Sequence, residues 1–314
     1  MRVFLTGATG FIGSAIVPQL VRAGHRVTGL ARSDAAADAL EAAGVEVRRG
    51  SLDDLDSLGA GAAAADGVIH TAFIHDFTRA AAGLVDPSAV DRRAIGALGD
   101  ALEGSGKPLV ITSGTALIHD GRVATEDMSP DPTEPGSPRS GSEQLAKSLA
   151  SRGVRSSIVR PSPSVHGEGD HGFVPIVIDI ARRKGVSGYI GDGANRWAAV
   201  HRLDIAPLYR LALEEAPAGT VLHGVGDEGV PTRDIAEVIG RHLDVPVVSI
   251  AREDADEHFG FLAGFFGMDA PASSTLTQQR FGWTPTHRGL IADLDAGHYF
   301  EQARLAVTSS RGSR

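Results

Sequence analysis

The sequence predicts an α/β fold in which a doubly wound parallel sheet forms one large core and a smaller lobe is appended to it. Short runs rich in β-branched residues alternate with longer amphipathic segments, which is the pattern of strand, crossover helix and parallel strand. A glycine-rich turn follows the first run directly. With 314 residues and 42% hydrophobic content, the chain is long enough to bury one large core, with or without a smaller lobe.

Six runs are candidate strands of the sheet. The last four are rich in apolar or small residues, most clearly Gly67–Thr71 and Pro108–Thr112, as expected for strands that helices cover on both faces. The candidates are Arg2–Thr6, Arg26–Ala31, Val45–Arg48, Gly67–Thr71, Pro108–Thr112 and Val154–Arg160.

The segment between the first two candidate strands is predicted to be a helix. Apolar residues recur at helical spacing over 12–21, and Gly24 stands where a helix often ends in a left-handed residue. Pro18 removes one backbone donor from the interior, so we expect a less regular helix there. A later helix is expected over 231–243, with Thr232 as its cap.

The turn after the first candidate strand has the order T-G-x-x-G-x-x-G, with glycines at positions 7, 10 and 13. Gly7 permits a tight turn, Gly10 lets the backbone approach a pyrophosphate, and Gly13 allows the next helix to pack closely. The helix N-terminus presents unpaired N–H groups and a positive dipole end to an anion. Between a strand and a helix, the motif favours a Rossmann-type dinucleotide site over a turn needed only for packing.

Composition excludes several other classes of function. The chain has no cysteine, which rules out disulfides and thiolate metal sites and fits a reducing compartment. It has no run of about 18 apolar residues and no basic leader before an apolar stretch, so we expect a cytoplasmic protein without a membrane partner. A formal charge of −9 makes nucleic acid a poor partner. No histidine pair has metal-ligand spacing, so no metal is expected.

With these features in place, the chain resembles the extended or atypical branch of the short-chain dehydrogenase/reductase superfamily, which includes epimerase/dehydratase-like proteins. The resemblance covers nearly the whole chain. The matching segments are TGATGFIG (6–13), VIHTA (68–72), LVITSG (109–114), IVRPSPSVHGEGD (158–170), GDGANRWAAVHRLDIAPLYRLALE (191–214) and FGWTPT (281–286).

The resemblance implies a division into a cofactor domain and a smaller C-terminal substrate lobe. The cofactor-binding Rossmann domain would comprise residues 1–162, with 197–220 returning to it. The substrate lobe would comprise 163–196 and 221–314. A homodimer is a further expectation from the family.

The end of the second candidate strand indicates which nicotinamide cofactor is preferred. NAD needs an acidic residue there for its ribose 2′-hydroxyl, whereas NADP needs cations for its 2′-phosphate. The sequence reads GLARSD, in which Arg32 can hold a phosphate and Ser33 can add a hydroxyl. We therefore expect NADP(H). NAD(H) stays possible, because Asp34 could bind a 2′-hydroxyl and Arg32 could be a solvated surface residue.

The predicted cofactor contacts come from this strand end, from the glycine turn and from positions that the resemblance implies. The adenine is expected near residues 51 and 52. The set is Thr6, Gly7, Thr9, Gly10, Phe11, Ile12, Gly13, Arg32, Ser33, Ser51, Leu52, Thr71, Ala72, Arg139 and Pro161.

The catalytic residues resemble the family pattern only in part. In typical members a serine positions the substrate carbonyl, a tyrosine transfers the proton, and a lysine four residues later lowers the pKa of the phenol. Ser113 matches the serine, and Glu143 matches a glutamate that often follows the lysine. This alignment puts Arg139 at the lysine position and Pro135 at the tyrosine position. No tyrosine lies between residues 1 and 188, so the Tyr-Lys pair is missing.

Another group must then supply the proton, because an unassisted serine hydroxyl is a poor acid at neutral pH. Histidine titrates in the right range, and His166 stands where the family has the tyrosine of its V-Y-G segment. Tyr189 could supply a phenol from the opposite wall. Structural roles remain the alternative for each. The predicted catalytic residues are Ser113, His166 and Tyr189, and the predicted substrate-lining residues are Thr115, His119 and His171.

The leading functional hypothesis is an NADP(H)-dependent oxidoreductase that acts on a small carbonyl compound or alcohol. Four phenylalanines in the segment 258–274 favour an apolar or aromatic substrate, although such a cluster is usually core. A polar, proline-rich stretch at 120–142 is typical of a binding loop. Two alternatives stay open: an epimerase, isomerase or lyase that recycles its cofactor, and a sensor that binds NADP(H) without turnover.

Overall fold

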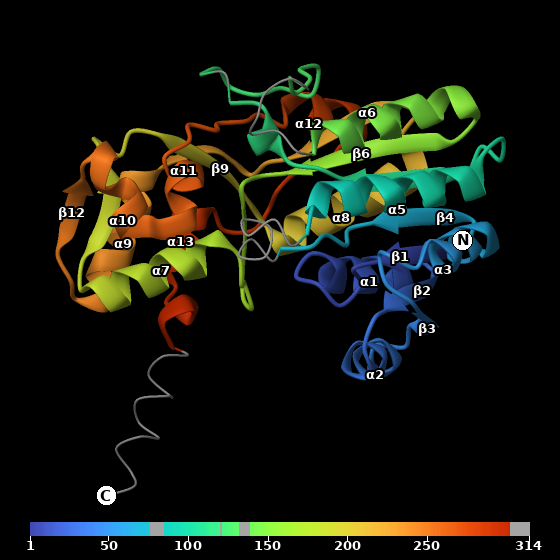
Figure 1. Ribbon diagram of the computed structural model, residues 1–314, viewed down its shortest axis with the longest axis horizontal. Coiled ribbons are helices and arrows are strands. Elements are labelled where there is room, and N and C mark those ends of the chain that lie inside the picture. The colour runs from blue at the N-terminus through green and yellow to red at the C-terminus, as the bar shows by residue number, and fades with distance from the viewer. Residues whose placement is uncertain (76–84, 120, 132–138, 302–314) are drawn as a thin grey trace, which may run out of the picture.

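The computed structural model describes residues 1–75, 85–119, 121–131 and 139–301. A seven-stranded sheet runs through the larger part of the molecule, and helices cover both of its faces (Figure 1). The strand order is β10-β6-β5-β4-β1-β2-β3, and every neighbouring pair is parallel. The predicted doubly wound α/β fold is confirmed.

The six candidate strands all exist, with ends shifted by at most one residue. Their bounds are β1 Arg2–Thr6, β2 Arg26–Ala31, β3 Glu46–Arg49, β4 Gly67–His70, β5 Pro108–Thr112 and β6 Arg155–Pro161. The seventh strand, β10 (Thr220–Gly224), adds to the edge beside β6 and was not predicted.

Alternate residues of each strand face opposite layers of helices. On β1, Val3 and Leu5 join a core cluster with α1 (Gly13–Arg22), α2 (Asp34–Ala42) and α8 (Arg202–Glu215). Phe4 points the other way. It joins a cluster with α3 (Leu55–Ala64), α5 (Pro87–Leu102) and α6 (Ser140–Leu149). Because side chains alternate along a strand, the near-continuous apolar runs of the sequence serve both layers.

The predicted helices differ from the structure in one detail. Helix α1 contains Pro18, as expected, and Gly24 beyond it has a φ of +81°. Helix α9 (Thr232–Leu243) begins at Thr232, but Pro231 occupies the cap position and no side chain caps the helix. Thr232 donates instead to the Asn195 side chain at 2.8 Å. The prediction that Thr232 caps this helix is therefore wrong, because its hydroxyl already serves a neighbouring loop.

The smaller lobe contains two small sheets and several helices, and lies at one end of the large sheet (Figure 1). A three-stranded sheet has the order β11-β9-β7 and a two-stranded sheet pairs β12 with β8. The strands are β7 Ser164–His166, β8 Ser187–Ile190, β9 Arg196–His201, β11 Asp227–Pro231 and β12 Val247–Ile250. The helices besides α9 are α7 Phe173–Lys184, α10 Ala255–Phe259, α11 Ala263–Phe266 and α13 Leu290–Asp295. Helix α12 (Thr275–Phe281) lies instead beside β10 of the large sheet (Figure 1).

Most of the phenylalanine-rich segment belongs to the core of this lobe. Phe259 and Phe266 are buried in it, and Phe265 stacks on Phe173 with ring centroids 4.2 Å apart. Phe261 is 60% exposed. Because aromatic burial here stabilises the lobe itself, the cluster gives little direct evidence for an apolar substrate pocket.

The chain crosses between the two parts at β9 and α8. Strand β9 belongs to the small sheet, whereas α8 packs on the large one and β10 joins it. The domain boundaries expected from the sequence stay a prediction. None of the helices that the structure describes is both long and apolar enough to cross a membrane.

Candidate nucleotide site and active site

The glycine turn between β1 and α1 is too tightly packed for side chains at two of its positions. Gly7 has a φ of +72°, and a Cβ there would lie 2.7 Å from the Ala72 nitrogen and the Thr71 hydroxyl. A Cβ at Gly13 would lie 2.0 Å from the Gly7 carbonyl oxygen. The close packing inferred for Gly13 is therefore present, and it brings the start of α1 directly against the turn.

Three successive backbone amides at the start of α1 lack a hydrogen-bond partner among the described residues. The cap residue Ile12 offers no side-chain hydrogen bond, and no acidic residue lies in the first turn. In the part of the chain that the structure describes, the amides of Phe11, Ile12 and Gly13 have no hydrogen-bond partner. Unpaired amides at a helix N-terminus attract an anion because the helix dipole is positive there. The residues present therefore fit the diphosphate of a dinucleotide.

The end of β2 presents an unpaired cation where a ribose phosphate is expected. Arg32 is exposed, and it makes no hydrogen bond or ion pair within the described residues. Ser33 accepts from the Ala36 amide at 3.2 Å as the cap of α2, which leaves its O–H available to donate. Asp34 pairs with Arg49 at 2.6 Å.

The two residues predicted to contact the adenine follow β3. The hydroxyl of Ser51 accepts from the amide of Asp53 at 3.3 Å, and Leu52 packs against one of the main core clusters. Both side chains are half-buried, so neither observation excludes a contact with the adenine.

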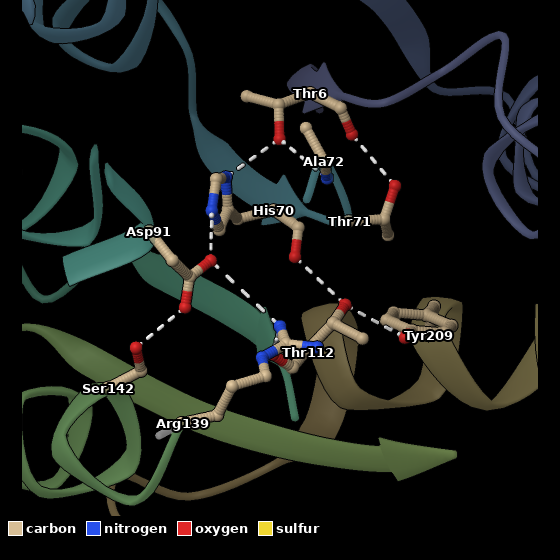
Figure 2. A network of polar contacts seen from close by, with 9 residues as sticks. All are labelled: Thr6, His70, Thr71, Ala72, Asp91, Thr112, Arg139, Ser142 and Tyr209. Atoms are coloured by element: carbon tan, nitrogen blue, oxygen red, sulfur yellow. Dashed lines mark hydrogen bonds and ion pairs between the residues drawn. The ribbon is translucent and has the colours of Figure 1, made fainter. Parts of the chain in front are cut away.

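A buried polar network joins the ends of β1 and β4 to α5 and α6 (Figure 2). Thr6 and His70 lie 2.7 Å apart from Oγ1 to Nδ1, and the other ring nitrogen of His70 lies 3.2 Å from the Asp91 carboxylate. Ser142 donates to the second oxygen of Asp91 at 2.6 Å. Burial opposes ionisation of Asp91. The hydrogen bond from His70 and the charge of Arg139 outweigh that effect and lower the pKa of Asp91.

Arg139, at the position of the family's lysine, reaches the ends of β4 and β5. Its Nη2 donates to the Thr112 carbonyl and lies 3.9 Å from the Asp91 carboxylate (Figure 2). Its guanidinium also lies over the Phe73 ring, 4.2 Å from the centroid. Its cationic head is thus fixed at the edge of the sheet where a cofactor of such a fold binds. Pro135, at the tyrosine position, lies outside the described residues.

Ser113 follows β5 directly and is buried. Its amide donates to the Val159 carbonyl at 2.9 Å. Its hydroxyl makes no hydrogen bond of regular geometry among the described residues. It does lie near Glu143, and this contact helps to lower the pKa of the Glu143 carboxylate. Thr115, two residues later, is also buried, and its hydroxyl has no partner among the described residues.

A buried ion pair between Arg160 and Glu143 lies next to Ser113. Arg160 donates to both oxygens of Glu143, at 2.8 and 2.6 Å. Burial opposes ionisation of Glu143, but the hydrogen bonds from Arg160 outweigh it and lower the pKa. Arg160 also lies 3.2 Å from Nε2 of His223. Burial, followed by the charge of Arg160, lowers the pKa of His223 to about 4, so this ring is neutral at pH 7.

The structure does not support His166 as a proton donor. The ring is completely buried on β7, Nδ1 lies 2.9 Å from Asp293 on α13, and its edge meets the ring of His201. Although Nε2 has no partner in the described part of the chain, it is enclosed. A proton donor must reach the substrate, and this ring has no exposed surface, so its burial gives no support to the predicted catalytic role, which stays a prediction.

Tyr189 is also misplaced for catalysis. It lies on β8, and the guanidinium of Arg233 lies over its ring at 5.5 Å. The neighbouring strand β12 forms the outer end of the small lobe, away from the large sheet (Figure 1). Tyr209 does approach the end of β5, where its hydroxyl lies 2.8 Å from Thr112 (Figure 2). It is completely buried, and burial raises its pKa, so it does not replace the missing phenol.

Three other predicted residues lie in three places. His171 meets the Phe11 ring edge-on at 5.7 Å, which puts it at the glycine turn. His119 follows the short helical turn after Ser113 and lies 3.1 Å from the Ala116 carbonyl. Pro161 ends β6 and is buried. The sequence reasoning missed His70, Asp91 and Arg160, because their importance depends on contacts between distant segments.

Comparisons with known proteins agree with this geometry. The model of the NAD dependent epimerase/dehydratase family matches residues 3–223. An uncharacterised protein of Schizosaccharomyces pombe is 51% identical over 301 residues, covering 96% of this chain and 100% of the relative. The 4-hydroxy-2-methyl-3-oxo-4-farnesyl-3,4-dihydroquinoline-1-oxide ketoreductase of Stigmatella aurantiaca is 28% identical over 227 residues, covering 70% of this chain and 67% of the relative.

The fold is also similar to that of a solved enzyme structure. A double mutant of DesIV, a dTDP-glucose 4,6-dehydratase from Streptomyces venezuelae with NAD bound, superposes with a TM-score of 0.76 at 21% identity. The match covers 97% of this chain and 98% of that one. The chain therefore belongs to the NAD-dependent epimerase/dehydratase family, as an atypical extended member of the short-chain dehydrogenase/reductase superfamily.

Proposed function

We propose that the protein is an NADP(H)-dependent oxidoreductase that interconverts a small apolar or aromatic carbonyl compound and its alcohol. The observation that carries this proposal is the set of three unpartnered amides, Phe11 to Gly13, on a turn that excludes side chains at Gly7 and Gly13. Such a turn fits a diphosphate. The nicotinamide, when bound, would supply or accept the hydride.

The end of β2 supports NADP over NAD. Arg32 has no partner within the described residues, so its guanidinium is available to a 2′-phosphate. The carboxylate of Asp34, which NAD would use, pairs with Arg49 instead. Arg49 ends the neighbouring strand β3, and its charge offsets that of the Asp34 carboxylate.

The residues at the end of β5 support chemistry on a substrate oxygen. Within the described residues the Ser113 hydroxyl makes no regular hydrogen bond, so it can donate to a carbonyl oxygen of a substrate. Arg139, held by Asp91 and Thr112, places a fixed cation beside it. Since the Tyr-Lys pair is missing, the developing alkoxide would take its proton through Ser113 or from water. We therefore expect slower turnover than a phenol would allow.

The ketoreductase relative supports a carbonyl substrate. The family and the fold neighbour favour the second candidate, an epimerase, isomerase or dehydratase that recycles a bound cofactor. The missing Tyr-Lys pair favours the third, a sensor that binds NADP(H) without turnover. These candidates differ in whether NADPH is consumed.

The test is a screen of aldehydes, ketones and quinones in which the absorbance of reduced nicotinamide is followed over time. The proposal predicts NADPH consumption with at least one apolar or aromatic carbonyl compound. Product formation without net consumption would indicate a recycling enzyme. No reaction across a broad panel, with NADPH binding intact, would favour the sensor.

A further inference from the structure

An arginine at the junction between the small lobe and the large sheet contacts the first turn of α1. Arg202 is the first residue of α8 and directly follows β9. Its guanidinium lies over the ring of Phe11, 4.7 Å from the centroid, and its Nη2 donates to the Ser14 hydroxyl at 3.1 Å. Phe11 belongs to the glycine turn and Ser14 to the first turn of α1. The cation is thus close to the three unpartnered amides.

This is an unfavourable place for a cation without an anion. The N-terminus of a helix carries partial positive charge, and the first turn of α1 has no acidic residue to offset it. Within the described ranges, no carboxylate lies at ion-pair distance from Arg202. Its Nε is enclosed and has no partner there. Burial lowers the pKa of Arg202, and the more distant charge of Glu168 opposes this shift without cancelling it.

Residues 167–171, which we call the strap, pack closely against the side chain of Arg202. A Cβ at Gly167 would lie 3.0 Å from Cγ of Arg202, and the glycine has a φ of +135°. Nη1 of Arg202 donates to the Glu168 carbonyl at 2.9 Å. His171, at the end of the strap, meets the same Phe11 ring. Arg202 therefore connects the strap to the glycine turn.

The strap is also fixed from the C-terminal side of the lobe. The Tyr299 hydroxyl accepts from the Gly167 amide at 3.1 Å and donates to Asp170 at 2.9 Å. Because both ends of the strap are anchored, Arg202 can hold its guanidinium at the turn with little loss of conformational freedom on binding.

We propose that Arg202 is a ligand of the cofactor's diphosphate, opposite the amides of Phe11, Ile12 and Gly13. Nη2 would pair with a phosphate oxygen, while Nη1 keeps the strap against the glycine turn. This inference rests on the proposed nucleotide binding, and it adds to the site a residue from the junction between β9 of the small lobe and α8.

The test is calorimetric titration of NADPH into the intact protein and into three variants. Arg202→Met keeps much of the stem over Phe11 but removes the charge, and should weaken NADPH binding by about ten- to a hundredfold. Arg202→Lys keeps the charge but lacks the planar guanidinium, so its NADPH affinity should lie between those of the wild type and Arg202→Met. The matched control is Arg210→Met on the same helix. Arg210 pairs with Glu214, so NADPH affinity should not change.

Two further measurements separate a diphosphate contact from a general disturbance. The dependence of NADPH affinity on salt should be weaker in Arg202→Met than in the wild type, because one ion pair is lost. Adenosine 2′-monophosphate, which has no diphosphate, should bind both proteins equally. Melting temperatures establish that each variant is folded. If Arg202→Met does not fold, the NADPH affinity of Arg202→Lys and its salt dependence test the diphosphate contact instead.

The outcomes separate this inference from the proposed function. Equal NADPH affinity of the wild type and folded Arg202 variants would overturn the role of Arg202 and leave the proposed function standing. If Arg202→Met lost as much affinity for adenosine 2′-monophosphate as for NADPH, the role of Arg202 would also be overturned, because the effect would then not involve the diphosphate. If the wild type binds neither NADPH nor NADH, both proposals fail together.

Discussion

Two polar regions of the molecule contain similar residue types but differ in how their polar groups are satisfied. At the carboxyl edge of the large sheet, the amides that open α1, the Arg32 guanidinium and the Ser113 hydroxyl have no regular partner among the described residues. In the lobe histidine cluster, which we define as His166, His201 and His287 with Asp204 and Asp293, most of the polar atoms are paired.

The pairs of the lobe cluster are short and mostly internal. His166 lies 2.9 Å from Asp293, and His287 lies 2.6 Å from Asp204 while its ring stacks on His201. Asp204 also accepts from the backbone amides of Thr286 and His287. Buried polar groups that are already bonded stabilise a fold, whereas groups left without partners at the end of a sheet are available to a ligand. The comparison therefore assigns the ligand site to the first region and a structural role to the second.

The largest expected effect comes from closing the glycine turn. Gly13→Ala would put a Cβ 2.0 Å from the Gly7 carbonyl oxygen, so we expect NADPH binding to fall by more than about a hundredfold, with a lower melting temperature. The control is Gly96→Ala in α5, where a Cβ meets nothing within 4 Å and stability should rise by about 0.5–1 kcal/mol. Calorimetry and thermal melting measure both. Undiminished binding in Gly13→Ala would contradict the assignment of the turn.

Ser113→Ala tests the reacting end of the site. We expect kcat to fall by about a hundredfold while NADPH affinity stays the same, because the hydroxyl would contact the substrate oxygen and not the cofactor diphosphate. Ser164→Ala is the matched control. Ser164 is also a buried serine without a hydroxyl partner among the described residues, but it lies on β7 of the small lobe. Full turnover in Ser113→Ala would exclude the serine from catalysis.

Arg32→Ala tests the choice of cofactor. NADPH affinity should drop by about tenfold or more, since a charged hydrogen bond to the 2′-phosphate is lost, while NADH affinity should hardly change. Arg93→Ala provides the control, because Arg93 is an exposed arginine that pairs with Asp53 on the surface. Parallel losses for NADPH and NADH would show that Arg32 does not read the 2′-phosphate.

His223 gives the first region a measurable pH dependence. Its pKa is lowered to about 4 in the folded protein from 6.5, so the unfolded chain binds a proton that the folded chain does not. Stability should therefore fall as pH drops from about 6.5 to about 4, with a contribution near 1.4 kcal/mol per pH unit from this ring. Denaturant unfolding across that range measures it. His223→Asn should have a shallower slope than the wild type, and an identical slope would contradict the burial argument.

The smallest expected effect on turnover belongs to the lobe cluster. His166→Phe removes the hydrogen bond to Asp293 and should reduce stability by about 1–3 kcal/mol, whereas His166→Asn can keep a donor there. Neither folded variant should lose kcat. A large loss of kcat with unchanged NADPH affinity would restore His166 as a catalytic residue and reverse the comparison between the two regions.

The sequence predicted the fold better than the site, for a physical reason. Strand runs and glycine spacing are local properties, so β1, the turn and α1 could be placed from them. Ser113 and Arg139 could be placed because each stands at a fixed distance from such a segment. The structure lends no support to His166 and Tyr189 as catalytic residues, because Asp293 and Arg233 lie against them, and the sequence does not show these contacts. Asp91 and Arg202 act through contacts with segments far away in the chain, which no local pattern indicates.

The central claim is that the amides of Phe11, Ile12 and Gly13 bind the diphosphate of a nicotinamide cofactor. Calorimetric titration of the intact protein with NADPH and then with NADH tests it most directly. We expect saturable binding of NADPH at one site per chain, tighter than that of NADH. If neither NADPH nor NADH released or absorbed heat on titration, the claim would be contradicted.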